Sequence, residues 1–297
     1  WRPRVGELLY GFVPSDRIHL VCRAVALLFR DYGDRFDRSM ARLKVVVEHI
    51  GIDECRKMVG RFLDEEGVDR GDFEVQAIDD CGPAPPERPM AEVDPRGDDG
   101  KAIAQIMVRE GELDFHAMRR VAELSERYGD KYVYLTNRQN FELHGVDPEK
   151  LAELQAEIDK LPITTGPFFA LDDVVPCVGT TYCPLAVSET RRLYDQLQSV
   201  VKREKYDAVR AGAIINITGC PNSCSPYYIA DIGFRGMRIR ESQASAEGYQ
   251  VRLGGTQERF GLVLGEFKTE DCPRVLEAAL DTFMAIRSDG ETLAETV

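Results

Sequence analysis

Four cysteines in two unequal pairs constrain this chain more than any other feature. Cys177 and Cys183 have five residues between them, Cys220 and Cys224 have three, and 36 residues separate the two pairs. An iron–sulfur cubane needs four thiolates that converge on one small volume, and a loop pair combined with a strand-end pair can supply them. The spacing therefore predicts a redox cluster site.

A structural zinc site and disulfide bonds stay open as alternatives from the residues alone. Zinc sites usually place roughly two to four residues between paired ligands, and the five residues between Cys177 and Cys183 exceed that range. Eight cysteines in 297 residues are too few for a disulfide-dense scaffold. Of the remaining four, we expect Cys22 and Cys55 to be small core residues of helices, while Cys81 falls in a proline-rich stretch and Cys272 at a helix start.

Composition bounds the class of protein. Hydrophobic residues make up 43% and charged residues 30%, as in soluble globular proteins. A net charge of −13 argues against nucleic acid as a partner. No apolar run approaches the roughly 20 residues of a membrane helix and no leader opens the chain, so we expect a cytoplasmic protein without a membrane partner. The chain begins at Trp1, within a segment that resembles the middle of a fold, and we expect a fragment.

Hydrophobic periodicity divides the chain into segments. We expect an N-terminal helix that is capped by Ser15 and Asp16, and further helices over 39–49 and 53–63. Proline and glycine then predict a linker over 64–100. The next segments predict a compact α+β unit, with strands over 102–108, 131–135 and 139–143 and helices over 114–128 and 148–161.

The cysteine-bearing region is also predicted to alternate between helices and strands. We expect Pro184 at the first position of a helix that ends near Lys205, and a buried strand over Ala213–Ile217 that delivers Cys220 to its end. Further segments are predicted as strands over 228–234, 249–253 and 260–264 and as a helix over 271–286.

Several strings resemble the siroheme-dependent nitrite and sulfite reductases. PCVGTTYCPLA (176–186) and NITGCPNSCSPYYIADIGFRG (216–236) match the cluster motif of that family at both spacings. YLTNRQNFELHGV (134–146) resembles the element that opens each half of these enzymes, and RDYGDRFDRSMARLKVVVEHIGID (30–53) resembles the stretch that closes the first half.

The resemblance implies a fold and a division into domains. The fold is α+β, with a ferredoxin-like half domain followed by an α/β domain that binds siroheme and the 4Fe-4S cluster, after a helical remnant of the first half. The implied boundaries are 1–63 for the helical end of the first half, 64–100 for the linker, 101–165 for the half domain and 166–297 for the cluster domain. Most of the first half is then expected to be missing, so the chain alone is not expected to be a competent reductase.

The same resemblance implies roles for individual residues. The cluster would be held by Cys177, Cys183, Cys220 and Cys224, and Cys224 would also bridge to the siroheme iron. Siroheme carries many carboxylates that suit arginine, and the positions that match cofactor-binding ones are Arg38, Arg42, Lys44, Gln139, Asn140 and Asn222. Arg138 matches a substrate-binding arginine, although a structural role fits this second copy of its motif equally well.

The implied activity is the six-electron reduction of nitrite to ammonia. TTYC (180–183) and PNSC (221–224) look more like nitrite than sulfite members, and sulfite reduction by the same cofactors is the alternative. Ferredoxin or a flavoprotein would supply the electrons. A different class, a non-catalytic 4Fe-4S electron-transfer module without siroheme, also stays open.

Overall fold

The computed structural model describes residues 3–71, 73, 93–94, 100–165, 170–240 and 244–297. The chain divides into two compact units, Trp1–Glu87 and Arg88–Val297. Most of the expected linker 64–100, and Cys81 with it, lies outside the described residues. No helix among the residues that are described is long and apolar enough to cross a membrane.

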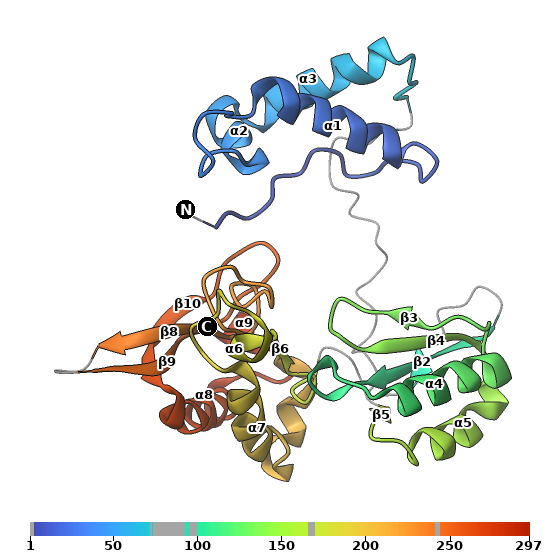
Figure 1. Ribbon diagram of the computed structural model, residues 1–297, viewed down its shortest axis with the longest axis vertical. Coiled ribbons are helices and arrows are strands. Elements are labelled where there is room, and N and C mark those ends of the chain that lie inside the picture. Colours follow the sequence, from blue (N-terminus) through green and yellow to red (C-terminus); the bar gives the residue numbers. More distant parts are fainter. Residues whose placement is uncertain (1–2, 72, 74–92, 95–99, 166–169, 241–243) are drawn as a thin grey trace. The chain divides into compact units, whose positions relative to one another are not determined.

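The first unit is helical (Figure 1). Its helices are α1 (Ile18–Tyr32), α2 (Leu43–Ile50) and α3 (Ile52–Glu65). Gly51 separates α2 from α3 with a φ of 81°, a left-handed conformation that suits glycine. The helices bury one cluster of side chains, formed by Val21, Ala24, Leu28, Cys55, Val59 and Leu63.

Two expectations for this unit are wrong. Helix α1 begins at Ile18 rather than after Asp16 and has no side-chain cap, because a backbone turn from Pro14 to Arg17 leads into it. Cys22 is exposed rather than in the core. The buried face of α1 contains Val21, and the next residue on a helix points about 100° away from it. Cys55 is buried, as expected.

The described residues of the second unit form two sheets. The first is antiparallel, and α4 and α5 pack against it (Figure 1). Asp114 begins α4, where its carboxylate accepts from the backbone N–H groups of His116 and Ala117. Inward side chains alternate along the central strand. The elements are β1 (Val93–Asp94), β2 (Ala102–Met107), β3 (Tyr134–Leu135), β4 (Phe141–Val146), β5 (Thr164–Thr165), α4 (Phe115–Tyr128) and α5 (Leu151–Ile158).

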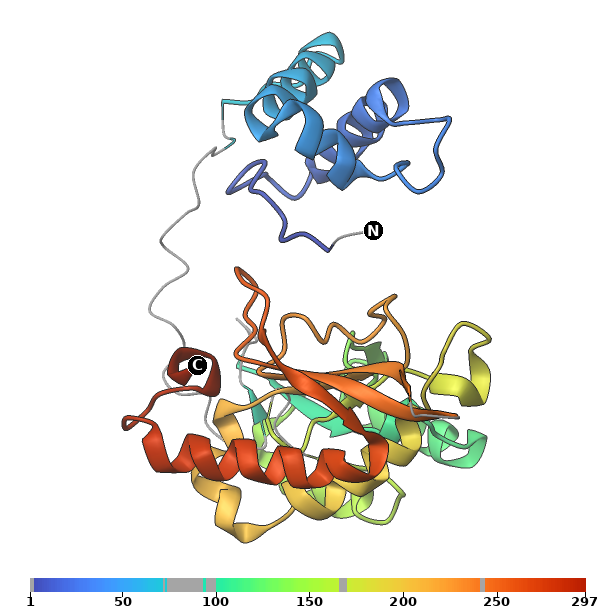
Figure 2. The same cartoon turned by 90° about the vertical axis from the view of Figure 1, so that its left-hand side faces the viewer.

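The second sheet has the order β10-β9-β8-β7-β6. Strands β6, β7 and β8 are parallel, whereas β8, β9 and β10 are antiparallel. Figure 2 shows α8 along one face of this sheet, and α7 joins it in the same core. The elements are β6 (Val175–Pro176), α6 (Gly179–Tyr182), α7 (Thr190–Val201), β7 (Ile215–Thr218), β8 (Ile232–Arg240), β9 (Ser245–Leu253), β10 (Leu262–Lys268), α8 (Cys272–Ile286) and α9 (Leu293–Thr296).

The expected α+β class is confirmed, and so are the strand at β2 and the helices α4 and α8. Pro184 does not begin a helix, because α7 starts only at Thr190, where the side chain of Glu189 caps it. The strand expected from Tyr228 begins at Ile232, because turns occupy the residues between them.

Candidate functional site

Parallel strand pairing brings the two cysteine pairs to one edge of the second sheet. Val175 and Pro176 of β6 lie beside Asn216 and Ile217 of β7 in parallel register. The chain therefore leaves both strands at the same end, and Cys177 donates its backbone N–H to the Ile217 carbonyl at 2.8 Å. Cys183 follows α6, while Cys220 and Cys224 follow β7, so each pair is delivered by one of the two strands.

The Cys224 thiol lies within electrostatic reach of the other three thiols. The pKa of the Cys224 thiol is raised, first by partial burial and then by the neighbouring thiols of Cys177, Cys220 and Cys183. Cys220 is buried, Cys177 and Cys183 are half-buried, and Cys224 is exposed. The set therefore has a closed side formed by the strands and an open side at Cys224.

A backbone N–H group faces the sulfur atom of Cys177. The N–H of Gly219 donates to Cys177 Sγ at 3.1 Å, and the carbonyl of Gly219 accepts from Val187 at 2.9 Å. A side chain at Gly219 would not fit, since a Cβ there would lie 2.9 Å from the Ser188 carbonyl oxygen. A backbone N–H that donates to a cysteine sulfur is the kind of contact that orients a metal ligand, so this arrangement suits a cysteine that ligates iron.

The geometry does not suit one shared metal ion. Among the described residues, no three His, Cys, Asp or Glu side chains converge on a position for a single ion. Zinc requires its ligands around one centre, whereas each cysteine of a cubane binds a different iron and the four sulfurs surround a volume. Two thiol pairs at the ends of two neighbouring strands are a donor set that a cubane can use.

A polar network ties the cysteine loop to Glu112, in the connection between β2 and α4. The Tyr182 hydroxyl, next to Cys183, donates to Glu112 at 3.0 Å. Arg191 of α7 pairs with Glu112 at 2.5 Å and lies 5.0 Å above the Tyr182 ring. Hydrogen bonds from Arg191 and Tyr182 lower the pKa of the Glu112 carboxyl. The loop is therefore braced by residues that precede α4.

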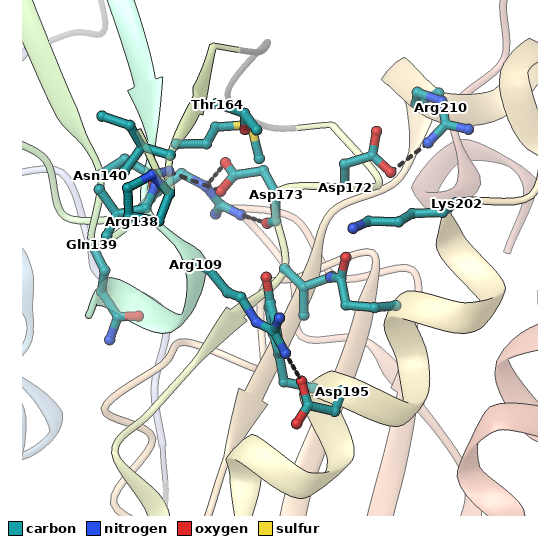
Figure 3. A pocket seen from close by; sticks show the side chains of 17 residues that line it. Arg109, Arg138, Gln139, Asn140, Thr164, Asp172, Asp173, Asp195, Lys202 and Arg210 are labelled. Carbon is teal, nitrogen blue, oxygen red and sulfur yellow. Dashed lines mark hydrogen bonds and ion pairs between the residues drawn. The ribbon is translucent and has the colours of Figure 1, made fainter. Parts of the chain in front are cut away.

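Arg138, Gln139 and Asn140 lie elsewhere, in the turn between β3 and β4. They line a cavity of about 600 Å³ (Figure 3), and none of the four cysteines is among the described residues that line it. Arg138 pairs with the buried carboxylate of Asp173. The Asn140 side chain donates to Asp173 at 3.0 Å and accepts from the Val108 N–H at 2.9 Å. Gln139 has a φ of 64°, in the left-handed region.

The other predicted cofactor residues are exposed or half-buried. Arg38 and Arg42 are exposed and Lys44 is half-buried, and all three belong to the first unit, whereas the four cysteines belong to the second. Arg42 donates to the carbonyl of Ala41 at 2.7 Å. Asn222 is exposed in the turn between Cys220 and Cys224.

The residues that hold the cysteine loop in place were not predicted from the sequence. The hydroxyls of Thr180 and Thr181 both donate to the Glu189 carboxylate, and Thr190 donates to the Cys177 carbonyl. A signal was available, because an acidic residue before an amphipathic segment is a helix-start pattern. Applied at Glu189, it would have placed the start of α7 and pointed to the hydroxyls before Cys183.

Family models match two stretches of the chain. Residues 95–161 match the nitrite/sulfite reductase ferredoxin-like half domain. Residues 2–66 match the nitrite and sulphite reductase 4Fe-4S domain, ahead of the stretch that holds the four cysteines.

Curated relatives match nearly the whole chain. Sulfite reductase [ferredoxin] 1 of Mycolicibacterium paratuberculosis is 31% identical over 98% of this chain and 53% of its own length. The chloroplastic ferredoxin–nitrite reductase of Oryza sativa subsp. japonica is 29% identical over 95% of this chain and 48% of its own length. The chain thus spans about half the length of the curated relatives it matches.

A solved structure agrees with the sequence matches. The NirA protein of Mycobacterium tuberculosis superposes with a TM-score of 0.82 at 27% identity, over 99% of this chain and 54% of that one. The half-domain match, the relatives and the shared fold agree with the cysteine motif. The chain belongs to the family of siroheme-dependent nitrite and sulfite reductases.

Proposed function

We propose that this chain carries the 4Fe-4S cluster and the siroheme-bridging cysteine of an enzyme that reduces nitrite to ammonia. The observation that carries the proposal is the gathering of four thiols at one edge of the β6–β7 pair. Cys177, Cys183 and Cys220 would each hold one iron. Cys224, on the open side, would hold the fourth and face the siroheme.

The cofactor pair would supply one-electron steps to an anion at the open siroheme iron. Arg38, Arg42 and Lys44 would bind siroheme carboxylates, since arginine pairs with them in bidentate fashion. The exposure of Arg38 and Arg42 leaves their guanidinium groups accessible to such a ligand. Gln139 and Asn222 are proposed to face the cofactor. Arg138 and Asn140 are proposed to hold the β3–β4 turn against Asp173, and a catalytic role for Arg138 stays a prediction.

Sulfite is the second candidate substrate. Relatives named sulfite reductase and relatives named nitrite reductase match this chain at similar identity, 31% and 29%. Nitrite is placed first because of the TTYC and PNSC strings. Ser223, within PNSC, has a φ of 56°, a conformation that favours glycine. Ferredoxin is the proposed electron donor, as in the names of these relatives.

Anaerobic reconstitution of the 297-residue chain with ferrous iron and sulfide tests the cluster. We expect about four irons per chain and a cluster absorption band. Cys177→Ser should abolish both, whereas the matched control Cys22→Ser, at an exposed thiol of the first unit, should leave them unchanged. A Cys177→Ser protein that keeps the full iron content would overturn the ligand set.

Addition of siroheme to the reconstituted chain tests the second cofactor. We expect siroheme uptake and cluster-coupled spectra, with nitrite and sulfite compared as ligands that shift the siroheme bands. Arg42→Ala should lower siroheme uptake more than iron content. A chain that takes up the cluster but never siroheme would instead indicate an electron-transfer module.

A further inference from the structure

Helix α6 fills the gap between the first two cysteines and has little intrinsic stability. It covers only Gly179–Tyr182, and its end is closed by the Cys183 N–H donating to the Gly179 carbonyl at 3.0 Å. So short a helix does not persist by itself, because nucleation costs more than one hydrogen bond returns. Thr180 and Thr181 are exposed, so burial does not hold it either.

One carboxylate stabilises α6 from outside. Glu189 Oε2 accepts from the Thr180 hydroxyl at 2.7 Å and from the Thr181 hydroxyl at 2.8 Å. Its other oxygen, Oε1, accepts from the Arg191 N–H at 3.2 Å, at the start of α7. Although burial alone would raise it, the pKa of Glu189 is lowered by these donors, so the acceptor is charged. Hydrogen bonds to a charged acceptor are about twice as strong as neutral ones.

The backbone of Glu189 is itself anchored on the second sheet. Its N–H donates to the Glu247 carboxylate on β9, and its carbonyl accepts from the fully buried Tyr249 hydroxyl at 3.0 Å. The next residue, Thr190, donates to the Cys177 carbonyl. Both ends of the cysteine loop are therefore anchored to the same two consecutive residues. Thr190 holds Cys177, and Glu189 holds helix α6, which ends just before Cys183.

We propose that Glu189 is a positioning residue that fixes the Cys177–Cys183 loop in its ligand geometry before any cluster binds. The inference deepens the proposed function and rests on its cluster. Groups that orient metal ligands typically change metal affinity by roughly 10- to 100-fold when they are removed. If Glu189 only capped α7, its removal would destabilise that helix. Hydrogen exchange in the Cys177–Cys183 loop and the binding of iron by its cysteines would then stay unchanged.

Hydrogen exchange of the cluster-free, full-length chain tests preorganisation directly. Glu189→Ala should speed exchange of the Cys183 amide, and the double variant Thr180→Val, Thr181→Val should do the same while leaving the cap on Arg191 intact. Glu295→Ala is the matched control, because Glu295 accepts from Thr292 in the capping box of α9. If Glu189→Ala fails to fold, the threonine variant decides. Unchanged exchange at Cys183 in the threonine variant would overturn the proposal.

Release of iron from the reconstituted chain to a chelator tests the consequence for the cluster. We expect iron release to be roughly 10- to 100-fold faster than in wild type in Glu189→Ala and in the threonine variant. The acceleration should be smaller in Glu189→Gln, which keeps a neutral acceptor, and the release rate should be unchanged in Glu295→Ala. A wild-type chain that takes up no cluster would overturn the proposed function. A wild-type chain that binds the cluster beside a Glu189→Ala chain that keeps it equally long would overturn only the positioning role.

Discussion

The guanidinium of Arg138 lies against the carboxylate of Asp173, and the two side chains are only 8% and 3% exposed. The pair joins the β3–β4 turn to the segment that leads into β6 and Cys177. Asn140 adds a second hydrogen bond to the same carboxylate. Arg138, whose sequence position matched a substrate-binding arginine, thus forms a buried contact between the first sheet and the segment that leads into the second sheet.

Breaking this pair should destabilise the second unit. Arg138→Ala leaves a buried carboxylate without its charge partner, so we expect the free energy of unfolding to fall by about 3–5 kcal/mol. Arg127→Ala, which breaks an exposed pair with Glu153, should cost at most about 1 kcal/mol. Urea unfolding monitored by circular dichroism measures both, and equal losses in the two variants would contradict a structural role for the buried pair.

Gly179→Ala should disturb the cysteine loop. Gly179 has a φ of 59°, and a Cβ there would lie 2.5 Å from Thr190 Oγ1 and 2.8 Å from Thr190 N. The left-handed backbone alone costs about 1–2 kcal/mol for a residue with a side chain, and the clash adds to it. Gly290→Ala is the control, since Gly290 has a φ of 77° with nothing within 4 Å. We expect a larger loss of unfolding free energy and faster exchange at Cys183 only in Gly179→Ala. Identical losses in the two variants would show that the contact with Thr190 is unimportant.

Asp231 should make stability depend on pH. Asp231 is 9% exposed, and burial raises the pKa of its carboxyl to about 6 even though the carboxylate accepts from the Ile214 N–H. The folded state therefore holds the proton more tightly than the unfolded state. The stability from this group is full below about pH 4 and is lost as the pH rises to about 6, by up to about 3 kcal/mol.

Asp231→Asn removes this titration. The difference in unfolding free energy between wild type and Asp231→Asn should shift in favour of the variant between pH 4 and pH 6.5 and stay constant above. Guanidinium titrations at several pH values measure it, and a difference that does not change with pH would refute the raised pKa.

The cysteines outside the cluster motif should differ in reactivity. Cys22 is exposed, whereas Cys55 and Cys272 are 2% and 0% exposed. Burial also raises the pKa of the Cys272 thiol to about 12, and only the thiolate reacts with alkylating agents. Iodoacetamide at pH 8 should therefore label Cys22 in the folded chain, and Cys55 and Cys272 only after unfolding. Peptide mass spectrometry identifies the labelled positions, and equal rates at Cys22 and Cys55 would contradict the burial pattern.

Local patterns in the sequence predicted elements that depend on neighbours along the chain. The strand predicted over 102–108 and the helices predicted over 114–128 and 271–286 follow from such local signals and match β2, α4 and α8. These signals failed where two patterns in one segment compete. Pro184 suits both a helix start and a turn, and in the structure it begins a turn, whereas the helix starts only after Glu189.

The cluster site was also predictable from the sequence, through the spacing of Cys177, Cys183, Cys220 and Cys224 along the chain. The ability of a thiol to bind iron belongs to the side chain itself and does not depend on where the fold places it. The tertiary structure alone decided which groups surround those thiols. Parallel pairing of β6 with β7 puts Cys177 beside the Gly219 N–H, and folding brings Asp173 to Arg138, 35 residues away. The sequence by itself therefore determined the donor atoms and their order along the chain. Their positions in space, their hydrogen-bond partners and the charges around them were decided by contacts between distant segments, which hydrophobic burial and strand pairing select and no local pattern encodes.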